Sequence, residues 1–184
     1  MFPTDNCPLV QTACAAAPQS LTEPNIEGIK ADAMIVHALG LAVPARRNLS
    51  DSQAQRGEQL FGTIGCATCH IPELYTSALE GWPELSNQHI RPFTDLLLHD
   101  MGPGLADDRP DFDASGSEWR TAPLWGIGLV KTVNKHTRFL HDGRARDVSE
   151  AVLWHGGEGE KAKENFRKMP SIDRKALLAY LNSL

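Results

Sequence analysis

Two cysteines and a histidine close together constrain this chain more than any other feature. Cys66, Cys69 and His70 form the pattern C-x-x-C-H, which is the attachment signature of c-type haem. Two thiols three positions apart lie on one face of a helical turn, so both can add to the vinyl groups of one porphyrin. His70 then directs its imidazole at the iron as the proximal ligand. The motif therefore predicts a domain built around one covalent haem c.

The same motif has two other interpretations. A C-x-x-C pair can be half of a zinc site, with Cys7 and Cys14 or two histidines as the other ligands. However, six residues separate Cys7 from Cys14, whereas zinc ligands are usually about two to four residues apart. A thioredoxin-like redox pair needs a strand before the motif, and here the preceding pattern is helical. In the oxidising compartment where haem is attached, Cys7 and Cys14 can alternatively form a disulfide.

Composition excludes several classes of protein. The 184 residues are 41% hydrophobic and 22% charged, which is typical of a soluble globular domain. The net charge of −5 argues against a nucleic-acid binder, which needs a basic face. The longest apolar stretch, residues 33–43, is about 11 residues long, and a membrane helix needs about 20. The first five residues lack the basic and apolar regions of a secretory signal.

Hydrophobic periodicity predicts a mainly α-helical fold, a cytochrome c-like domain with long loops. An N-terminal tail over 1–25 contains several prolines, and the cytochrome c domain is expected over 26–184. Residues 71–118 have little regularity, apart from a short helical or turn segment at 92–98 and an exposed acidic loop at 106–118. Helices are predicted over 27–41, 51–63, 147–155 and 158–168, and from Ser171 to the end.

Local signals refine these helices. Ser50 with Gln53 forms a capping-box pattern, and Asp147 with Glu150 suits the start of the later helix. A glycine on the apolar face of 51–63, Gly57, predicts close helix packing. Apolar side chains around a short helix in 119–130 are expected to be buried, and a second apolar stripe marks the terminal helix. These two sets are Trp119, Leu124, Trp125 and Ile127, and Leu177, Tyr180, Leu181 and Leu184.

A haem iron held by His70 has a sixth position to fill. The candidate ligands are Met101, Met169, His141 and His155. Val148, Val152 and His155 follow one another at i, i+4 and i+7, so the imidazole of His155 projects from an apolar helical stripe. Met169 precedes a proline before the terminal helix, as the ligating methionine often does in small cytochromes c.

Four longer segments resemble one bacterial family, the di-haem thiol oxidoreductases or putative peroxidases. The family is distantly similar to the di-haem cytochrome c peroxidases and to the haem protein that matures methylamine dehydrogenase. The resemblance extends from about Phe2 to Leu184. The segments are residues 95–102 (DLLLHDMG), 118–126 (EWRTAPLWG), 139–145 (FLHDGRA) and 150–157 (EAVLWHGG).

The resemblance implies how the chain is used. The family carries two haem domains in a chain more than twice this length, so this sequence corresponds to the C-terminal, electron-transfer half. A chain truncated before Met1 would also explain the missing signal peptide, and implies a periplasmic protein. A natural single-haem relative is the alternative. The implied partner is a redox protein or a second haem domain of the parent chain, and no residue of this half is expected to be catalytic.

The resemblance also bears on the ligands. In the peroxidases the second ligand of this haem is a methionine, in the methylamine dehydrogenase maturation protein it is a tyrosine, and the matching position here is His155. Met101 falls where relatives carry an apolar residue. A bis-His iron with a lower potential than a His/Met iron is therefore expected. Three arginines are candidate partners for the haem propionates: Arg120, Arg144 and Arg146. Ion pairs on the protein surface would explain these arginines equally well.

Overall fold

The computed structural model describes residues 10–17, 26 and 28–184, in two compact units, Met1–Ala42 and Val43–Leu184. The first unit holds α1 (Thr12–Ala15) and α2 (Gly28–Leu39). α2 confirms the helix predicted over 27–41, and neither helix buries a residue. Cys7 lies outside the described residues, so its pairing with Cys14 stays a prediction, as does the domain boundary near residue 25.

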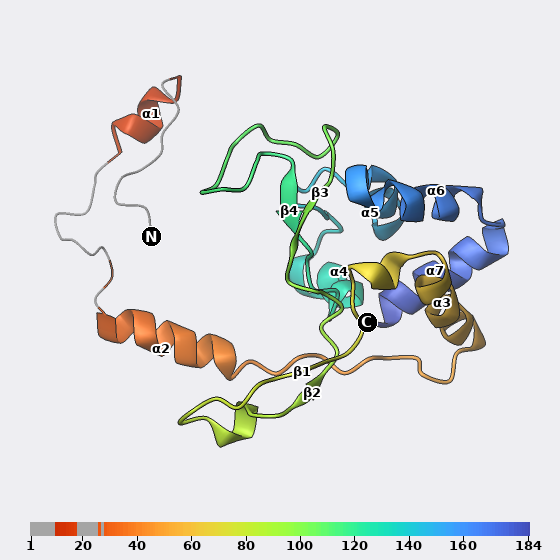
Figure 1. Ribbon diagram of the computed structural model, residues 1–184, viewed down its shortest axis with the longest axis horizontal. Helices are drawn as coiled ribbons and strands as arrows, with labels where there is room; N and C mark the ends of the chain where they lie inside the picture. The colour runs from red at the N-terminus through yellow and green to blue at the C-terminus, as the bar shows by residue number, and fades with distance from the viewer. Residues whose placement is uncertain (1–9, 18–25, 27) are drawn as a thin grey trace. The chain divides into compact units, whose positions relative to one another are not determined.

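The second unit contains the C-x-x-C-H motif and is mainly α-helical, with two small antiparallel sheets, β1–β2 and β3–β4 (Figure 1). Within the described residues, no helix is long and apolar enough to cross a membrane. The elements of this unit are α3 (Ser52–Thr63), η1 (Cys66–Thr68), β1 (Leu74–Tyr75), η2 (Pro83–Leu85), β2 (His89–Ile90), β3 (Leu98–Asp100), β4 (Glu118–Arg120), η3 (Ile127–Leu129), α4 (Val130–Asn134), α5 (Val148–Trp154), η4 (Gly157–Gly159), α6 (Glu160–Lys168) and α7 (Ser171–Ser183).

α3 leads the chain into the motif, and its first turn is capped by Asp51. The Asp51 carboxylate accepts a hydrogen bond from the backbone N–H of Gln53 at 2.8 Å. The capping box predicted at Ser50 is therefore wrong by one residue. The side-chain oxygen of Asp51 reaches the second helical residue, which is one of the two positions an N-cap satisfies.

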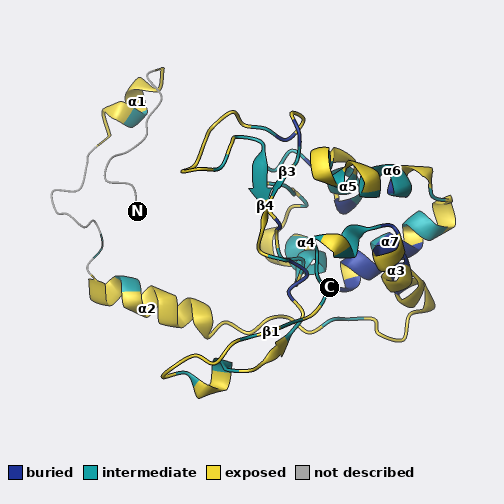
Figure 2. Cartoon of the chain, viewed as in Figure 1, coloured by how far each residue is buried: buried dark blue, intermediate teal, exposed yellow. Residues whose placement is uncertain are grey.

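α3 and α7 pack side by side and form the centre of the core (Figure 2). Gly57 makes this approach close, because a Cβ there would lie 2.1 Å from the backbone oxygen of Ala176. The rings of Phe61 and Tyr180 meet edge to face with centroids 5.5 Å apart. The predicted apolar stripe of the terminal helix is confirmed: its four residues are all buried, with Leu177 fully so.

The segment from 92 to 98 is not helical, contrary to the helical alternative predicted for it. Phe93 (φ 56°) and Leu96 (φ 62°) adopt the left-handed conformation, which interrupts any right-handed helix. The following residues pair as β3 with β4, where His99 faces Trp119. The residues predicted to be buried around η3 are not fully buried. Trp119, Leu124 and Ile127 are half-buried, and Trp125 is 37% exposed, so the prediction is wrong for Trp125.

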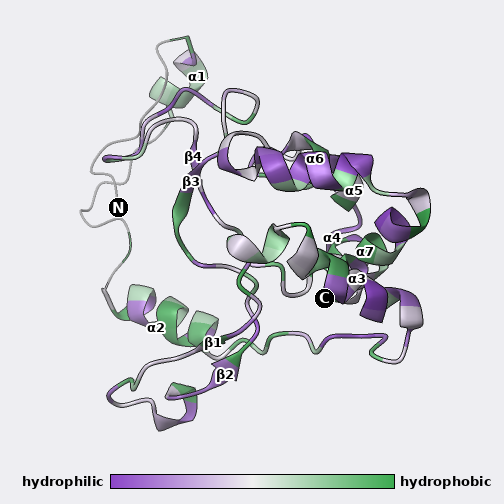
Figure 3. Ribbon diagram, turned by 45° about the vertical axis from the view of Figure 1, so that its right-hand side comes forward, coloured by the Kyte–Doolittle hydropathy of each residue, from purple (hydrophilic) through white to green (hydrophobic). Residues whose placement is uncertain are grey.

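The C-terminal helices begin and end where the sequence predicts. The Asp147 carboxylate accepts from the Glu150 N–H at 2.8 Å and caps α5. This helix ends at Trp154, and His155 follows it before two glycines. α6 is hydrophilic over most of its surface (Figure 3), but its Phe166 is 1% exposed and joins the core formed by α3 and α7. This arrangement holds the chain around His155 against the body of the second unit.

Candidate functional site

The C-x-x-C-H motif follows α3 directly. Cys66 begins the short η1 turn, and its carbonyl accepts the His70 N–H at 3.0 Å. Cys66 and Cys69 are free thiols. Burial raises the pKa of Cys66 to about 11. The pKa of Cys69 is also raised, mainly by burial and to a smaller extent by the negative charges of Asp95 and Glu158. A redox-active thiol needs a lowered pKa, so these surroundings do not favour the thioredoxin-like interpretation.

One ring nitrogen of His70 is hydrogen-bonded to the backbone. Its Nδ1 lies 2.9 Å from the carbonyl oxygen of Phe93, and this contact assigns the proton to Nδ1. Burial lowers the pKa of His70, so the imidazole is neutral at pH 7. Thr94, which is 1% exposed, donates to the carbonyl of Thr121 at 2.7 Å and fixes the loop that carries Phe93. With the proton on Nδ1, Nε2 is the ring nitrogen whose lone pair could bind a metal, and a backbone contact with Ala122 also acts on this ring.

His155 repeats this arrangement at the end of α5. Its Nδ1 lies 2.8 Å from the carbonyl oxygen of Ala151, one turn earlier in the helix. Burial lowers its pKa as well, so His155 is also neutral with Nε2 available. His155 therefore has the same tautomer as His70, although the two residues are 85 positions apart in the sequence.

The structure brings these two histidines together. Their ring centroids are 6.5 Å apart and the rings are tilted by 52°. A histidine–metal bond is about 2 Å long, so two such bonds in line place the ring centres roughly 6 Å apart. The separation of His70 and His155, their tautomers and the adjacent free thiols therefore fit one covalently attached haem between them.

The other candidate ligands are placed differently. His141 stacks on Trp119 with centroids 3.7 Å apart, and its Nε2 is hydrogen-bonded to the carbonyl of Leu105 at 3.1 Å. Met169 packs against the hydrophobic core. Met101 lies beside His155: an ideal Cβ on Gly159 would be 3.2 Å from the Met101 methyl and 3.3 Å from the His155 ring. Met101 is therefore the one nearby alternative among these candidates.

The three arginines remain predictions as propionate partners. Arg144 pairs with Asp142 at 2.6 Å, and its guanidinium lies 5.0 Å from the centre of the Trp154 ring. Arg146 pairs with Glu150 at 2.7 Å and its side chain is 76% exposed. Arg120 is exposed on β4. The ion pairs of Arg144 and Arg146 are of the kind expected if these arginines form surface salt bridges and do not bind propionates.

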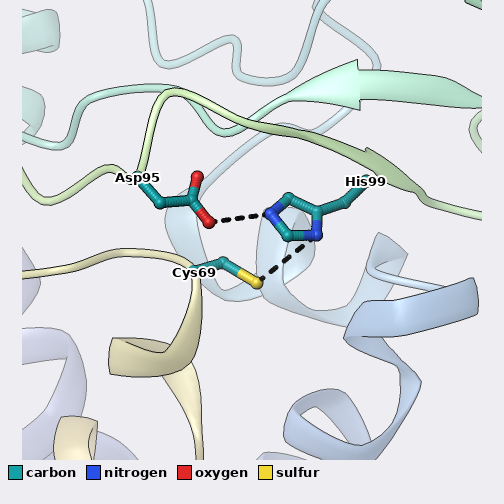
Figure 4. A group of neighbouring side chains, drawn as sticks. All are labelled: Cys69, Asp95 and His99. Atoms are coloured by element: carbon teal, nitrogen blue, oxygen red, sulfur yellow. Dashed lines mark hydrogen bonds and ion pairs between the residues drawn. The ribbon is translucent and has the colours of Figure 1, made fainter.

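A cluster beside Cys69 was not predicted from the sequence (Figure 4). The His99 ring lies between two carboxylates, with Nε2 2.8 Å from Asp95 and Nδ1 2.8 Å from Glu158. The same Nδ1 is 3.9 Å from the sulfur of Cys69. The spacing of Asp95 and His99 was a weak signal, because four positions bring side chains together in a helix and this segment is not helical. Glu158 comes from a distant segment.

Within the described part of the chain, Cys69, Asp95 and His99 form the only group of three or more side chains of metal-ligand type. Its geometry favours an ion pair over a metal site, because carboxylates already occupy both ring nitrogens of His99. Hydrogen bonds that the His99 ring donates to the carboxylates of Glu158 and Asp95 raise the pKa of His99. Burial opposes ionisation of Asp95, but bonds from the Leu97 N–H and from His99 outweigh it and lower its pKa to about 2.

The raised pKa of His99 gives a testable pH dependence. A group whose pKa is raised by folding stabilises the fold fully below its unfolded pKa, here 6.5, and loses that contribution as pH rises through the folded value. We therefore expect the difference in unfolding free energy between wild type and His99→Asn to shrink from pH 6 to pH 9. Denaturant unfolding at each pH measures it, and a difference that grows with pH would contradict the ion pairs.

Comparison with known proteins identifies a family. A family model described as "di-haem oxidoreductase, putative peroxidase" matches residues 14–184. Curated proteins and solved structures give no match. The match covers the C-x-x-C-H motif and both histidines, and it brings with it a haem cofactor and a haem-based redox role. This chain belongs to the di-haem oxidoreductase family.

Proposed function

We propose that this chain is a c-type cytochrome domain with one haem c attached through Cys66 and Cys69. His70 and His155 would hold the iron from opposite sides, giving a low-spin bis-His centre. One observation supports this most: the two neutral imidazoles lie 6.5 Å apart, each with Nδ1 on a backbone carbonyl. Carbonyls that fix the tautomer and orientation of a ligating histidine are usual around metals.

The proposed role is one-electron transfer. Haem supplies the redox chemistry when it is bound. The chain's own residues hold the two imidazoles, keep them neutral through burial and leave no open axial position for peroxide. A peroxidase step would then belong to another haem, and this half would deliver or accept electrons. Two histidine ligands favour a lower potential than a histidine with a methionine.

The partner follows from the family and the motif. A di-haem family match on a chain with one C-x-x-C-H supports a second haem domain of a parent chain, or a separate redox protein, as the electron partner. Covalent haem attachment by two thioethers takes place outside the cytoplasm in bacteria, so we place the protein in the periplasm. Arg120, Arg144 and Arg146 are proposed to face the propionates or the partner.

The test is an absorption spectrum of the oxidised protein, made in a host that exports it and attaches haem. We expect low-spin iron without the far-red charge-transfer band of a methionine–iron bond. That band would instead assign Met101 or Met169 as the ligand. A high-spin spectrum would indicate an open position, and would favour a haem that itself reacts with peroxide.

Replacing both motif cysteines tests the covalent attachment. In a Cys66→Ser, Cys69→Ser variant we expect haem to separate from the protein in acidified acetone, whereas wild type keeps its haem. The cluster of Cys69, Asp95 and His99 is the observation behind a different alternative, a zinc site. Stoichiometric zinc and no haem in protein exported with the attachment machinery would support that alternative and overturn the cytochrome proposal.

A further inference from the structure

We propose that Asp95, His99 and Glu158 form a clamp that positions His155 opposite His70 and thereby keeps the sixth position of the iron closed. The inference rests on the proposed bis-His ligation and deepens it. None of these three residues is proposed to touch the iron. Asp95 lies close in sequence to the segment that supports His70, and Glu158 to the turn after His155. His99 contacts both carboxylates and so joins the two segments; its contact with Asp95 is drawn in Figure 4.

The distal end of the clamp is Glu158, three positions after His155. One carboxylate oxygen lies 2.8 Å from Nδ1 of His99, and the other accepts the Asp100 backbone N–H at 3.0 Å. Both partners belong to β3, so this single side chain ties the segment after His155 to the sheet. The Glu158 side chain is 57% exposed, so solvent screens its ion pair with His99, and the connection depends on both carboxylate contacts together.

Backbone contacts reinforce the same connection. A Cβ on Gly157 would lie 2.1 Å from the carbonyl oxygen of Asp100, and one on Gly156 would lie 2.8 Å from that of Met101. Gly157 also has a φ of +49°, a conformation that glycine adopts readily. The turn that follows His155 therefore lies directly on the backbone of β3, with no side chain between them.

The proximal end of the clamp is Asp95. Its side chain is 7% exposed and accepts from the Leu97 N–H at 3.0 Å and from His99 at 2.8 Å. Asp95 is two positions from Phe93, whose carbonyl orients His70. His99 is also 3.9 Å from the sulfur of Cys69, the residue before His70. The clamp thus connects the support of the proximal histidine to the turn that carries the distal one.

The position of His155 explains why such a clamp is needed. His155 follows the last residue of α5, and its backbone has already left the helical conformation, with ψ at 126°. Its bond to Ala151 sets the direction of the ring, but the turn after it must be held from outside. Without the clamp, we expect the turn to move and His155 to leave the iron for part of the time, which exposes an axial site.

The test uses the haem-loaded chain and cyanide as the probe of an open axial site. In Glu158→Ala we expect oxidised protein to bind cyanide about tenfold more tightly, because apparent affinity follows the fraction of molecules that are open. His99→Asn should have a similar effect. Glu158→Gln keeps an oxygen for the Asp100 N–H and should lie between Glu158→Ala and wild type.

The matched control is Glu160→Ala, two positions further on. Glu160 pairs with Lys163 within α6, so its loss should leave cyanide affinity unchanged. If Glu158→Ala and His99→Asn bind cyanide with the same affinity as wild type, the clamp is overturned. The wild-type spectrum separates this failure from failure of the cytochrome proposal. If wild type has a low-spin bis-His spectrum and Glu158→Ala has unchanged cyanide affinity, the clamp alone is rejected. If wild type has any other ligation, both proposals are rejected.

Discussion

Replacing His155 by alanine is expected to convert the oxidised haem protein from low-spin to high-spin and to open it to external ligands. The His155 ring lies 6.5 Å from the His70 ring, and in the proposed centre its imidazole would be the second ligand of the iron. Without it, that position would hold water or remain empty. Cyanide affinity should then rise by about a hundredfold or more, because the closed form no longer competes. Absorption spectra and a cyanide titration measure both effects.

Two controls make this result specific. His141→Ala removes an imidazole that stacks on Trp119, and its spectrum should remain low-spin. The double variant His155→Ala, Met101→Leu excludes the methionine that lies beside His155 as a substitute ligand. If His155→Ala alone keeps the wild-type spectrum while His141→Ala loses it, the distal ligand has been assigned to the wrong histidine.

Replacing Gly57 by valine is expected to lower the free energy of unfolding by about 3 kcal/mol or more, from overpacking of a close contact. A Cβ at this position would be 2.1 Å from the Ala176 oxygen and 2.6 Å from Cβ of Tyr180. These atoms belong to α7 and cannot move without separating the two helices that form the core. Denaturant unfolding of the haem-loaded protein measures the loss.

Gly62 provides the matched control within the same helix. It is exposed, and a Cβ there would have nothing within 4 Å. Gly62→Ala should be neutral or stabilising by up to about 1 kcal/mol, as alanine is the better helix former. Equal stabilities of the Gly57→Val and Gly62→Ala variants would show that α3 and α7 are not packed as closely as described.

The two experiments probe different parts of one arrangement. α3 packs on α7 and delivers the chain into Cys66, so the core fixes the proximal side. α5 and the turn after it hold His155, which would form the distal side of the proposed centre. A loss at Gly57 should therefore lower stability, whereas a loss at His155 should change ligation with little effect on the core. Measuring stability and spectrum on both variants separates these roles.

Much of the helical framework was predictable because its signals are local. α2, α3, α5 and α7 appear close to their predicted limits, since apolar periodicity and caps act within a few residues. The one-residue error at the cap of α3 arose because Ser50 and Asp51 are both good caps. The segment 92–98 was less predictable, since left-handed residues such as Phe93 carry no clear sequence signal.

The sequence by itself determined the chemistry of the motif: Cys66, Cys69 and His70 are neighbours in the chain, and their spacing alone suits a c-type haem. It also predicted His155 as a ligand candidate, from its place in line with the apolar residues Val148 and Val152. Only the tertiary structure decided that the rings of His155 and His70 lie close together. The same holds for the contacts of His99 with Asp95 and Glu158. Residues so far apart in sequence come together through packing of the whole unit, which no local pattern encodes.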